Sequence, residues 1–225
     1  MDNDVLREAP LFSGLDDAAA ESLGSSMSQT RMQRGDVLFR EGDTGDRLYV
    51  VTEGKIKLGR RSADGRENLL AILGPGQMFG ELSLFDPGPR SATATAVTDC
   101  TLQSLGHEAL TGWLNARPDV ARGLLNQLAS RLRRANDVVA DLVFSDVPGR
   151  VAKALLDLSQ RFGRTADDGI HVHHDLTQEE LAQLVGASRE TVNKALADFA
   201  ARGWLRLEPR SVVLMDVERL QRRAR

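Results

Sequence analysis

The stretch FGELSLFDPGPRSAT, Phe79 to Thr93, gathers several chemically distinct residue types in fifteen positions. Glu81 follows a glycine, a Pro-Gly-Pro turn lies in the second half, and Arg90 stands immediately before a serine. An ionised carboxylate accepts hydrogen bonds from hydroxyl groups, whereas a guanidinium pairs with an anion. We therefore expect this stretch to bind a ligand that carries both hydroxyl groups and negative charge. The alternative is a surface turn with a solvated Glu/Arg pair.

Turn motifs punctuate the region around this stretch, from about Gly35 to Leu105. Short runs with strand character separate the turns, and they cover residues 37–39, 48–51, 56–58 and 69–73. A pair of strands with small and β-branched residues is expected within residues 91–105. Turn signals at intervals of about 8 to 12 residues favour an antiparallel sandwich, roll or barrel.

Composition limits the remaining possibilities. A chain of 225 residues with 41% hydrophobic and 27% charged residues is expected to fold as two domains rather than one. The acidic N-terminus lacks an apolar signal core, and no apolar run approaches the roughly 18 residues of a membrane span. We therefore expect a cytoplasmic protein without a membrane partner. Cys100 is the single cysteine, which excludes a disulfide framework, and it is expected to pack as a small hydrophobic residue.

A heptad pattern follows the β region. Its apolar positions are spaced three and four residues apart, at Leu125, Leu128, Leu132, Ala135, Val139 and Leu142. This seam predicts a long helix that pairs with the same helix of a second copy, so we expect a homodimer. One amphipathic helix packed on its own domain is the alternative.

The run DVPGR, Asp146 to Arg150, is expected to break this helix and to form a hinge, because proline lacks a backbone donor and glycine tolerates left-handed geometry. The predicted domains are residues 1–115, a dimerisation helix over 116–145, and a third segment over 146–225. Beyond the hinge we expect a helix over 151–162, a strand over 169–174, two further helices, and a hairpin over 204–215.

The stretch LTQEELAQLVGASRETVNKALADFAARGW, Leu176 to Trp204, predicts a helix-turn-helix. Thr177 and Glu180 form a capping box for the first helix, Gly186 makes the turn, and Ser188 caps the second helix. Such a second helix presents its N-terminal side chains to base edges in the DNA major groove. The residues expected to contact DNA are Thr177, Gln178, Ser188, Arg189, Glu190, Thr191 and Lys194. A helical hairpin with a solvated polar face is the alternative.

The first stretch, with FGEL followed by PRSAT, resembles the phosphate-binding cassette of the cyclic-nucleotide-binding domain. That domain is found in bacterial cyclic AMP receptor proteins and in regulatory subunits of cyclic-nucleotide-dependent kinases. The resemblance implies that Gly80 lets the backbone N–H groups near Glu81, Leu82 and Ser83 approach a cyclic phosphate. It further implies that Glu81 accepts the ribose 2′-OH, and that Arg90 and Ser91 bind the phosphate.

Base recognition in the bacterial family uses a threonine on the long helix, followed by a residue with a hydroxyl or amide group. This chain has Ala135 and Asn136 there, so the threonine is missing. An asparagine amide suits either the adenine N6 amino group or the guanine O6, and the resemblance favours cyclic AMP. Arg131, one turn earlier, either pairs with Glu81 or faces solvent.

The second stretch is similar over its whole length to the recognition unit of the same family. By this resemblance Arg189 reads a guanine and Glu190 a cytosine amino group, whereas Lys194 replaces the arginine that the best-known members carry. Altogether, residues 5–225 resemble the cyclic AMP receptor (Crp/Fnr) family of transcription regulators. An α+β fold is implied, with an N-terminal cyclic-nucleotide-binding β-roll that is jelly-roll-like, a long dimerisation helix, and a C-terminal winged helix-turn-helix.

The function implied by this resemblance is regulation of transcription rather than catalysis. The implied partners are cyclic AMP as an allosteric ligand, a palindromic double-stranded DNA operator, and RNA polymerase. Two alternatives stay open: a regulator of the same family that senses another ligand or none, and a cyclic-nucleotide-binding subunit that acts through protein contacts. His171 and His173 share one face of a predicted strand, but no carboxylate or cysteine at ligand spacing accompanies them, so no metal site is expected.

Overall fold

The computed structural model describes residues 24–62, 65, 67–86, 88–116 and 118–224, and within residues 113–134 only some of the side chains. The described residues form two compact units. The first unit contains the described residues up to Arg60 and residues Leu70–Arg134. The second unit contains Arg61–Leu69 and the residues from Ala135 onward.

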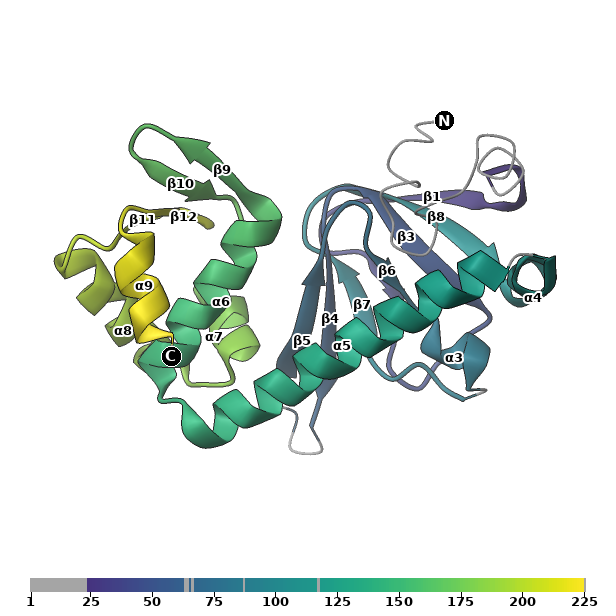
Figure 1. Cartoon of the computed structure of the whole chain (residues 1–225), viewed down its shortest axis with the longest axis horizontal. Helices are drawn as coiled ribbons and strands as arrows, with labels where there is room; N and C mark the ends of the chain where they lie inside the picture. Colours follow the sequence, from purple (N-terminus) through teal and green to yellow (C-terminus); the bar gives the residue numbers. More distant parts are fainter. Residues whose placement is uncertain (1–23, 63–64, 66, 87, 117, 225) are drawn as a thin grey trace. The chain divides into compact units, whose positions relative to one another are not determined.

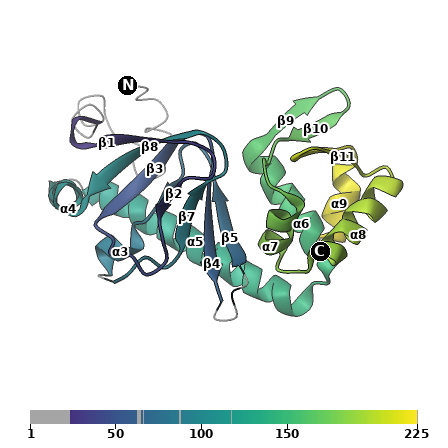
Figure 2. The same cartoon turned by 180° about the vertical axis from the view of Figure 1, so that it is seen from behind.

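Two four-stranded sheets dominate the first unit, except that Arg61 of one strand and Glu67–Leu69 of another belong to the second unit; Figures 1 and 2 show these sheets from opposite sides. In one sheet the strand order is β1 (Ser28–Met32), β8 (Cys100–Gly106), β3 (Arg47–Glu53) and β6 (Met78–Phe79). In the other the order is β2 (Val37–Phe39), β7 (Thr93–Ala96), β4 (Ile56–Arg61) and β5 (Glu67–Leu73). The pairings β1·β8, β3·β8, β3·β6, β2·β7 and β4·β7 are antiparallel. The antiparallel pairing agrees with the turn spacing, which favours a sandwich, roll or barrel, and the family resemblance implies the roll among these.

The core of this unit lies between the two sheets. Val51 and Leu102 from one sheet and Ile56 from the other are fully buried and belong to a single apolar cluster. Cys100 joins this cluster, and burial, with Asp36 and Asp99 nearby, raises the pKa of its thiol to about 11. A thiol with so high a pKa is unreactive at neutral pH, so Cys100 packs as the small hydrophobic residue that was expected.

The predicted strand runs all lie within observed strands, but the sequence did not indicate β1. Its residues SQTRM bury only Met32, so the segment lacks the apolar alternation that marks a strand. Among the described residues, the first part of the chain also contains the helices α3 (Leu82–Phe85), α4 (His107–Ala116) and α5 (Pro118–Phe144). α5 continues into the second unit.

After α5, the described residues of the second unit form four helices and one four-stranded sheet. After α5 the helices are α6 (Val147–Phe162), α7 (Gln178–Val185), α8 (Arg189–Ala201) and α9 (Val217–Arg223). The sheet has the order β11 (Leu205–Glu208), β12 (Ser211–Leu214), β10 (Gly169–Val172) and β9 (Gly163–Ala166). The predicted α+β fold with a winged helix-turn-helix is confirmed.

Two details of the predicted second unit are wrong. The helix after the hinge begins at Val147 rather than at residue 151, because Asp146 caps it by accepting from Gly149 N at 2.9 Å, and Pro148 is tolerated in a first turn. The break in the long helix therefore comes at Ser145 and Asp146. The predicted strand over 169–174 ends at Val172, and β9, whose residues are largely exposed, was not predicted.

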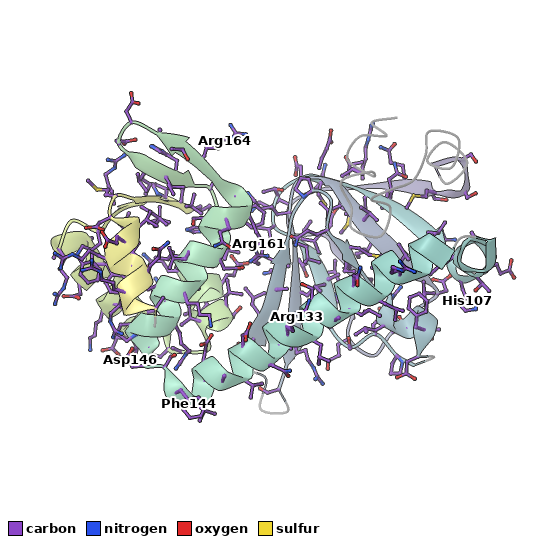
Figure 3. The ribbon with its side chains drawn as sticks, in the orientation of Figure 1. His107, Arg133, Phe144, Asp146, Arg161 and Arg164 are labelled. Carbon is purple, nitrogen blue, oxygen red and sulfur yellow. The ribbon has the colours of Figure 1, made fainter. Side chains whose placement is uncertain are left out.

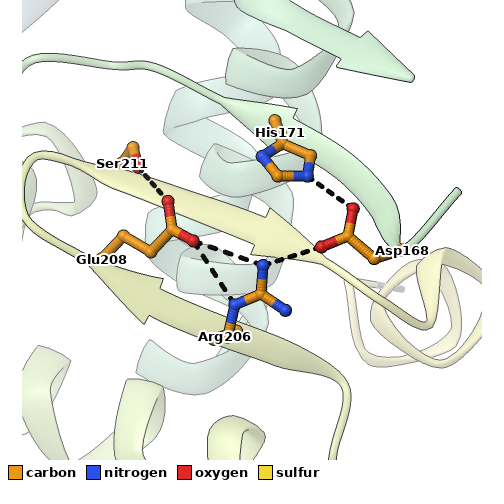
Figure 4. A network of polar contacts seen from close by, with 5 residues as sticks. All are labelled: Asp168, His171, Arg206, Glu208 and Ser211. Atoms are coloured by element: carbon orange, nitrogen blue, oxygen red, sulfur yellow. Dashed lines mark hydrogen bonds and ion pairs between the residues drawn. The ribbon is translucent and has the colours of Figure 1, made fainter. Parts of the chain in front are cut away.

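A polar network fastens the turn between β9 and β10 to the strands beside it (Figure 4). Asp168 Oδ1 lies 2.6 Å from His171 Nε2, and Arg206 Nη2 donates to Asp168 Oδ2 at 2.8 Å. Arg206 also reaches Glu208, which accepts from the Ser211 hydroxyl at 3.0 Å. Hydrogen bonds from His171 and Arg206 lower the pKa of the Asp168 carboxyl from its ordinary 3.8 to about 2.

This network makes a prediction about stability and pH. Because the folded pKa of Asp168 is depressed, its contribution is complete above the unfolded value near 3.8 and is lost as the pH falls toward 2. Asp168→Asn is therefore expected to lower the melting temperature at pH 7, with the difference from the unaltered chain closing between pH 4 and pH 2. Thermal unfolding at several pH values measures this. A difference that stayed constant across this range would contradict the assignment.

Candidate functional site

Arg90 is the centre of the first candidate site, and it is buried with 4% of its surface exposed. Its Nη1 donates to Gly80 O at 2.7 Å and to Ser83 Oγ at 2.9 Å. Its Nη2 donates to Arg47 O at 2.9 Å. Among the described residues these acceptors are two backbone carbonyls and a hydroxyl, all of them neutral. The guanidinium is thus fixed in position while its charge is left available to an anion.

The electrostatics of Arg90 follow from its burial. Loss of hydration lowers the pKa of its guanidinium below the ordinary value, and Tyr49, Asp46 and Glu81 act in the opposite direction. A guanidinium keeps its proton at neutral pH in any protein environment, so the group remains a cation. Burial in a low-dielectric site strengthens its attraction for an anion compared with an arginine in water.

Glu81 supplies a carboxylate that is completely buried. It stands at the N-terminus of the single-turn helix α3, with its backbone in the helical region. Burying a charged carboxylate is costly unless hydrogen bonds compensate for the lost water, so such a residue is seldom placed in a core for packing alone. The carboxylate and the guanidinium of the predicted site are therefore both inside the first unit, and they interact electrostatically.

Two glycines leave the space in which Arg90 and Ser83 make these contacts. Gly80 has a φ of +80°, and a Cβ there would lie 2.8 Å from Arg90 Nη1 and 3.1 Å from Arg47 O. A Cβ on Gly45 would lie 2.2 Å from Ser83 Oγ. Gly80 was predicted from the sequence as a ligand residue, whereas Gly45 was identified only as part of a turn. The need for a glycine at position 45 comes from the nearby Ser83 side chain, and no local sequence pattern reveals that contact.

The structure brings three of the predicted ligand residues, Gly80, Ser83 and Arg90, into direct contact. The side chains of two others, Leu82 and Ser91, are exposed. Ala135 and Asn136 lie on α5 in the second unit, and both are exposed. The side chain of Arg131 lies outside the described residues.

The helix-turn-helix forms as predicted. Thr177 Oγ1 accepts from Glu180 N at 3.1 Å, and Glu180 Oε2 accepts from Thr177 N at 2.8 Å, which completes the capping box. Gly186 ends α7 in the left-handed conformation with a φ of 71°. Ser188 caps α8 by accepting from Thr191 N at 3.2 Å.

The residues predicted to contact DNA all have exposed side chains: Thr177, Gln178, Ser188, Arg189, Glu190, Thr191 and Lys194. The opposite face of α8 is buried through Val192, Leu196 and Phe199. Lys194 Nζ lies 2.8 Å from Glu190 Oε1, so these two side chains are paired with each other in the described structure. An exposed pair of this kind contributes little free energy and separates easily.

Arg150 links the end of α5 to the turn of the helix-turn-helix. Its Nη1 donates to Ser145 O at 2.8 Å, its Nε to Val185 O at 3.1 Å, and its Nη2 to Gly186 O at 3.2 Å. Nearby, Arg223 of α9 pairs with the capping residue Asp146 at 2.5 Å. The sequence indicated Arg150 only as part of a hinge, because its acceptors are carbonyls up to 36 residues away.

Several large apolar side chains of α5 are exposed. Leu125, Leu132, Val139 and Leu142 of the heptad seam are each more than half exposed. Phe144, at the end of the helix, is 85% exposed and points away from it (Figure 3). Large apolar side chains in such a row are energetically unfavourable in water, and they mark a surface for association.

The residues that the structure describes contain neither a membrane-spanning helix nor a cluster of metal-binding side chains. No helix there is long and apolar enough to cross a lipid bilayer. No group of three or more histidine, cysteine, aspartate or glutamate residues there has a geometry that suits a metal ion.

Comparison with known proteins identifies a family domain in each of the two parts of the chain that contain the candidate residues. Residues 29–117 match the model of the cyclic nucleotide-binding domain, and residues 149–223 match that of the Crp-like helix-turn-helix domain. The chain is 56% identical to the CRP-like cAMP-activated global transcriptional regulator of Mycobacterium tuberculosis, over 99% of this chain and 100% of the relative.

Two solved structures are also similar. The N-terminal domain of a transcriptional regulator from Streptomyces coelicolor is 62% identical, with a TM-score of 0.51, over 64% of this chain and 99% of that one. The c-di-GMP-responsive global regulator CLP of Xanthomonas campestris is 28% identical, with a TM-score of 0.76, over 88% of this chain and 99% of that one. With both domain models matched and more than half of its residues shared with a full-length relative, the chain belongs to the Crp/Fnr family of transcription regulators, which are not enzymes.

Proposed function

We propose that this protein is a homodimeric transcription regulator that binds cyclic AMP and, in response, a palindromic DNA operator in the cytoplasm. The observation that carries the proposal is the buried guanidinium of Arg90, held by neutral acceptors beside the buried carboxylate of Glu81. A cyclic nucleotide offers one phosphate charge and one ribose 2′-OH, and these match the two groups. The name of the Mycobacterium tuberculosis relative supports cyclic AMP as the ligand.

Most of the predicted ligand residues have a role in this proposal. Arg90 and Ser91 bind the phosphate, and Ser83 both orients Arg90 and lies beside the phosphate site. Glu81 accepts the ribose hydroxyl, and the backbone near Gly80, Glu81 and Leu82 approaches the cyclic phosphate. Ala135 and Asn136 of α5 are the residues proposed to recognise the base.

The ligand is identified by calorimetric titration of the unaltered protein with cyclic AMP, cyclic GMP and c-di-GMP. A single buried guanidinium suits a single phosphate, so the proposal expects tightest binding of cyclic AMP. The c-di-GMP-responsive relative makes the third nucleotide the informative competitor. Tighter binding of c-di-GMP than of cyclic AMP would refute the proposed ligand.

The exposed seam of α5 supports the dimer. Burial of four large side chains against a second copy removes apolar surface that is otherwise in water. The two-fold axis of such a dimer places two α8 helices about 34 Å apart, one turn of B-DNA, so that they enter successive major grooves. A palindromic operator follows from that symmetry. RNA polymerase is the proposed further partner, because a regulator bound to an operator acts on transcription.

The hydrogen bonds of Arg150 suggest how the ligand signal reaches DNA. Arg150 holds the carbonyl of Ser145, at the end of α5, together with the carbonyls of Val185 and Gly186, at the turn before α8. A shift of the end of α5 therefore moves the start of the recognition helix with it. In this proposal cyclic AMP favours the arrangement in which both α8 helices fit their grooves.

Arg189 provides a test of the DNA-reading face. Arg189→Ala is expected to cost about 1–3 kcal/mol of operator affinity and to relax the preference at one base pair of each half-site, because a contact to a base edge is lost. Gln178→Glu, the comparison variant, is expected to weaken operator and random DNA about equally, because it only adds repulsion toward the phosphates. Fluorescence anisotropy at one salt concentration, with the operator, its single-base variants and random duplex, measures both. A uniform loss for Arg189→Ala would show that α8 does not read bases there.

A further inference from the structure

Three aromatic rings meet beside Arg90. Phe39 comes from β2 in one sheet, whereas Tyr49 and Phe79 come from β3 and β6 in the other. The ring centroids of Tyr49 and Phe79 are 5.4 Å apart, and Phe39 lies 5.9 Å from Tyr49 and 6.0 Å from Phe79. Centroid distances of this size are those of rings in contact. The rings thus form one layer that spans both sheets, which we call the aromatic floor.

The guanidinium of Arg90 lies on this floor. Its Cζ is 4.3 Å from the centroid of Phe39 and 5.7 Å from that of Tyr49. Both distances fall within the range in which a cation is attracted to the face of an aromatic ring. The N–H groups of Arg90 are directed to Gly80 O, Arg47 O and Ser83 Oγ. The guanidinium is therefore held both by aromatic rings and by hydrogen bonds.

This arrangement keeps a cation buried without neutralising it. A carboxylate paired directly with Arg90 would compete with the phosphate for the guanidinium, whereas an aromatic face stabilises the cation and leaves its charge unchanged. A carbonyl acceptor likewise adds no net charge. An anion that enters the site then meets a cation that is already desolvated and oriented, so little ordering remains to be done on binding.

We propose that Phe39 is a positioning residue for phosphate recognition, whose ring holds the Arg90 guanidinium in the orientation that binds the cyclic nucleotide. The inference rests on the proposed function, because it assumes that Arg90 binds the phosphate. The competing reading is that Phe39 only fills the core. Phe39 is half-buried on β2, which is an edge strand of its sheet, so a change there disturbs the fold less than a change at the fully buried Phe79.

The experiment compares cyclic AMP binding by calorimetry for three variants of the full chain. Phe39→Leu removes the aromatic face and is expected to weaken binding about 5- to 30-fold, the loss of one desolvated cation–π contact. Phe39→Tyr keeps the face and is expected to bind like the unaltered chain. Phe162→Leu is the matched control, because it removes a ring that lies 5.4 Å from Arg161 in the second unit, and it is expected to change nothing.

A double-mutant cycle separates positioning from packing. In an Arg90→Lys background the ammonium has no planar face to stack on the ring, so Phe39→Leu is expected to weaken cyclic AMP binding less than it does beside Arg90. An equal loss in both backgrounds would overturn the proposal, as would unchanged binding by Phe39→Leu alone. Thermal unfolding of every variant accompanies the titrations, and Phe39→Met replaces Phe39→Leu if the latter is unfolded. Failure of the unaltered chain to bind cyclic AMP would overturn the proposed function itself, and this inference with it.

Discussion

Arg90→Leu is expected to remove most of the affinity for cyclic AMP, at a cost of about 2–5 kcal/mol. The phosphate would enter a buried site that no longer contains its cation, and the carbonyls of Gly80 and Arg47 would lose a donor. Calorimetric titration measures the affinity, and thermal unfolding shows whether the variant keeps its fold.

The matched control for this prediction is Arg60→Leu. Arg60 is a surface arginine of the same unit that pairs with Glu41, and the variant is expected to bind cyclic AMP normally. Arg90→Lys keeps the charge but lacks the fork that binds Gly80 O and Arg47 O together, so its affinity should lie between those of Arg90→Leu and the unaltered chain. Binding by a folded Arg90→Leu variant at the unaltered level would remove Arg90 from the site.

Leu132→Asp is expected to separate the dimer and thereby to lower operator affinity by about 100-fold or more. Leu132 is 64% exposed in the middle of the seam of α5, and a carboxylate there would face its own copy across the two-fold axis. A monomer binds only one half-site and loses the advantage of two linked contacts, which is commonly a factor of roughly 10²–10⁴. Light scattering at micromolar concentration gives the mass, and anisotropy gives the affinity.

Arg133→Asp is the control for the dimer prediction. Arg133 is also exposed and follows Leu132 directly, so its side chain points about 100° away from the seam. The variant therefore introduces the same aspartate next to the seam rather than in it. This variant should remain a dimer. A monomeric mass for the unaltered protein would refute the role of the seam, whatever the variants do.

The helix-turn-helix was predictable because local interactions determine it. A capping box, a left-handed glycine and a second capping serine lie within twelve residues, and each signal specifies its own piece of backbone. The strands β1 and β9 gave no such signal, because their largely exposed residues lack an apolar alternation. The start of α6 was misplaced because proline was taken to end a helix, although Asp146 makes the same proline part of a first turn.

The surroundings of Arg90 were predictable only in part, for a related reason. Gly80, Glu81, Ser83 and Arg90 come from one stretch, whose resemblance to the phosphate-binding cassette singled them out, and the structure brings Arg90 into contact with Gly80 and Ser83. Phe39, Gly45 and Tyr49 come from earlier segments, and the sheets bring them to Arg90 through pairings that no short pattern encodes. The hydrogen bonds of Arg150 could not be predicted either, because its acceptor Val185 O comes close only when α6 and α7 pack together.

The most direct test of the account is the operator affinity of the unaltered protein with and without cyclic AMP, measured by anisotropy at one salt concentration. A ligand that shifts an equilibrium between two arrangements commonly changes affinity by roughly 5- to 150-fold, which corresponds to a coupling free energy of 1–3 kcal/mol. We predict an increase within this range for cyclic AMP, with random duplex little affected. Equal operator affinity with and without saturating cyclic AMP would contradict the claim that the nucleotide site controls DNA binding.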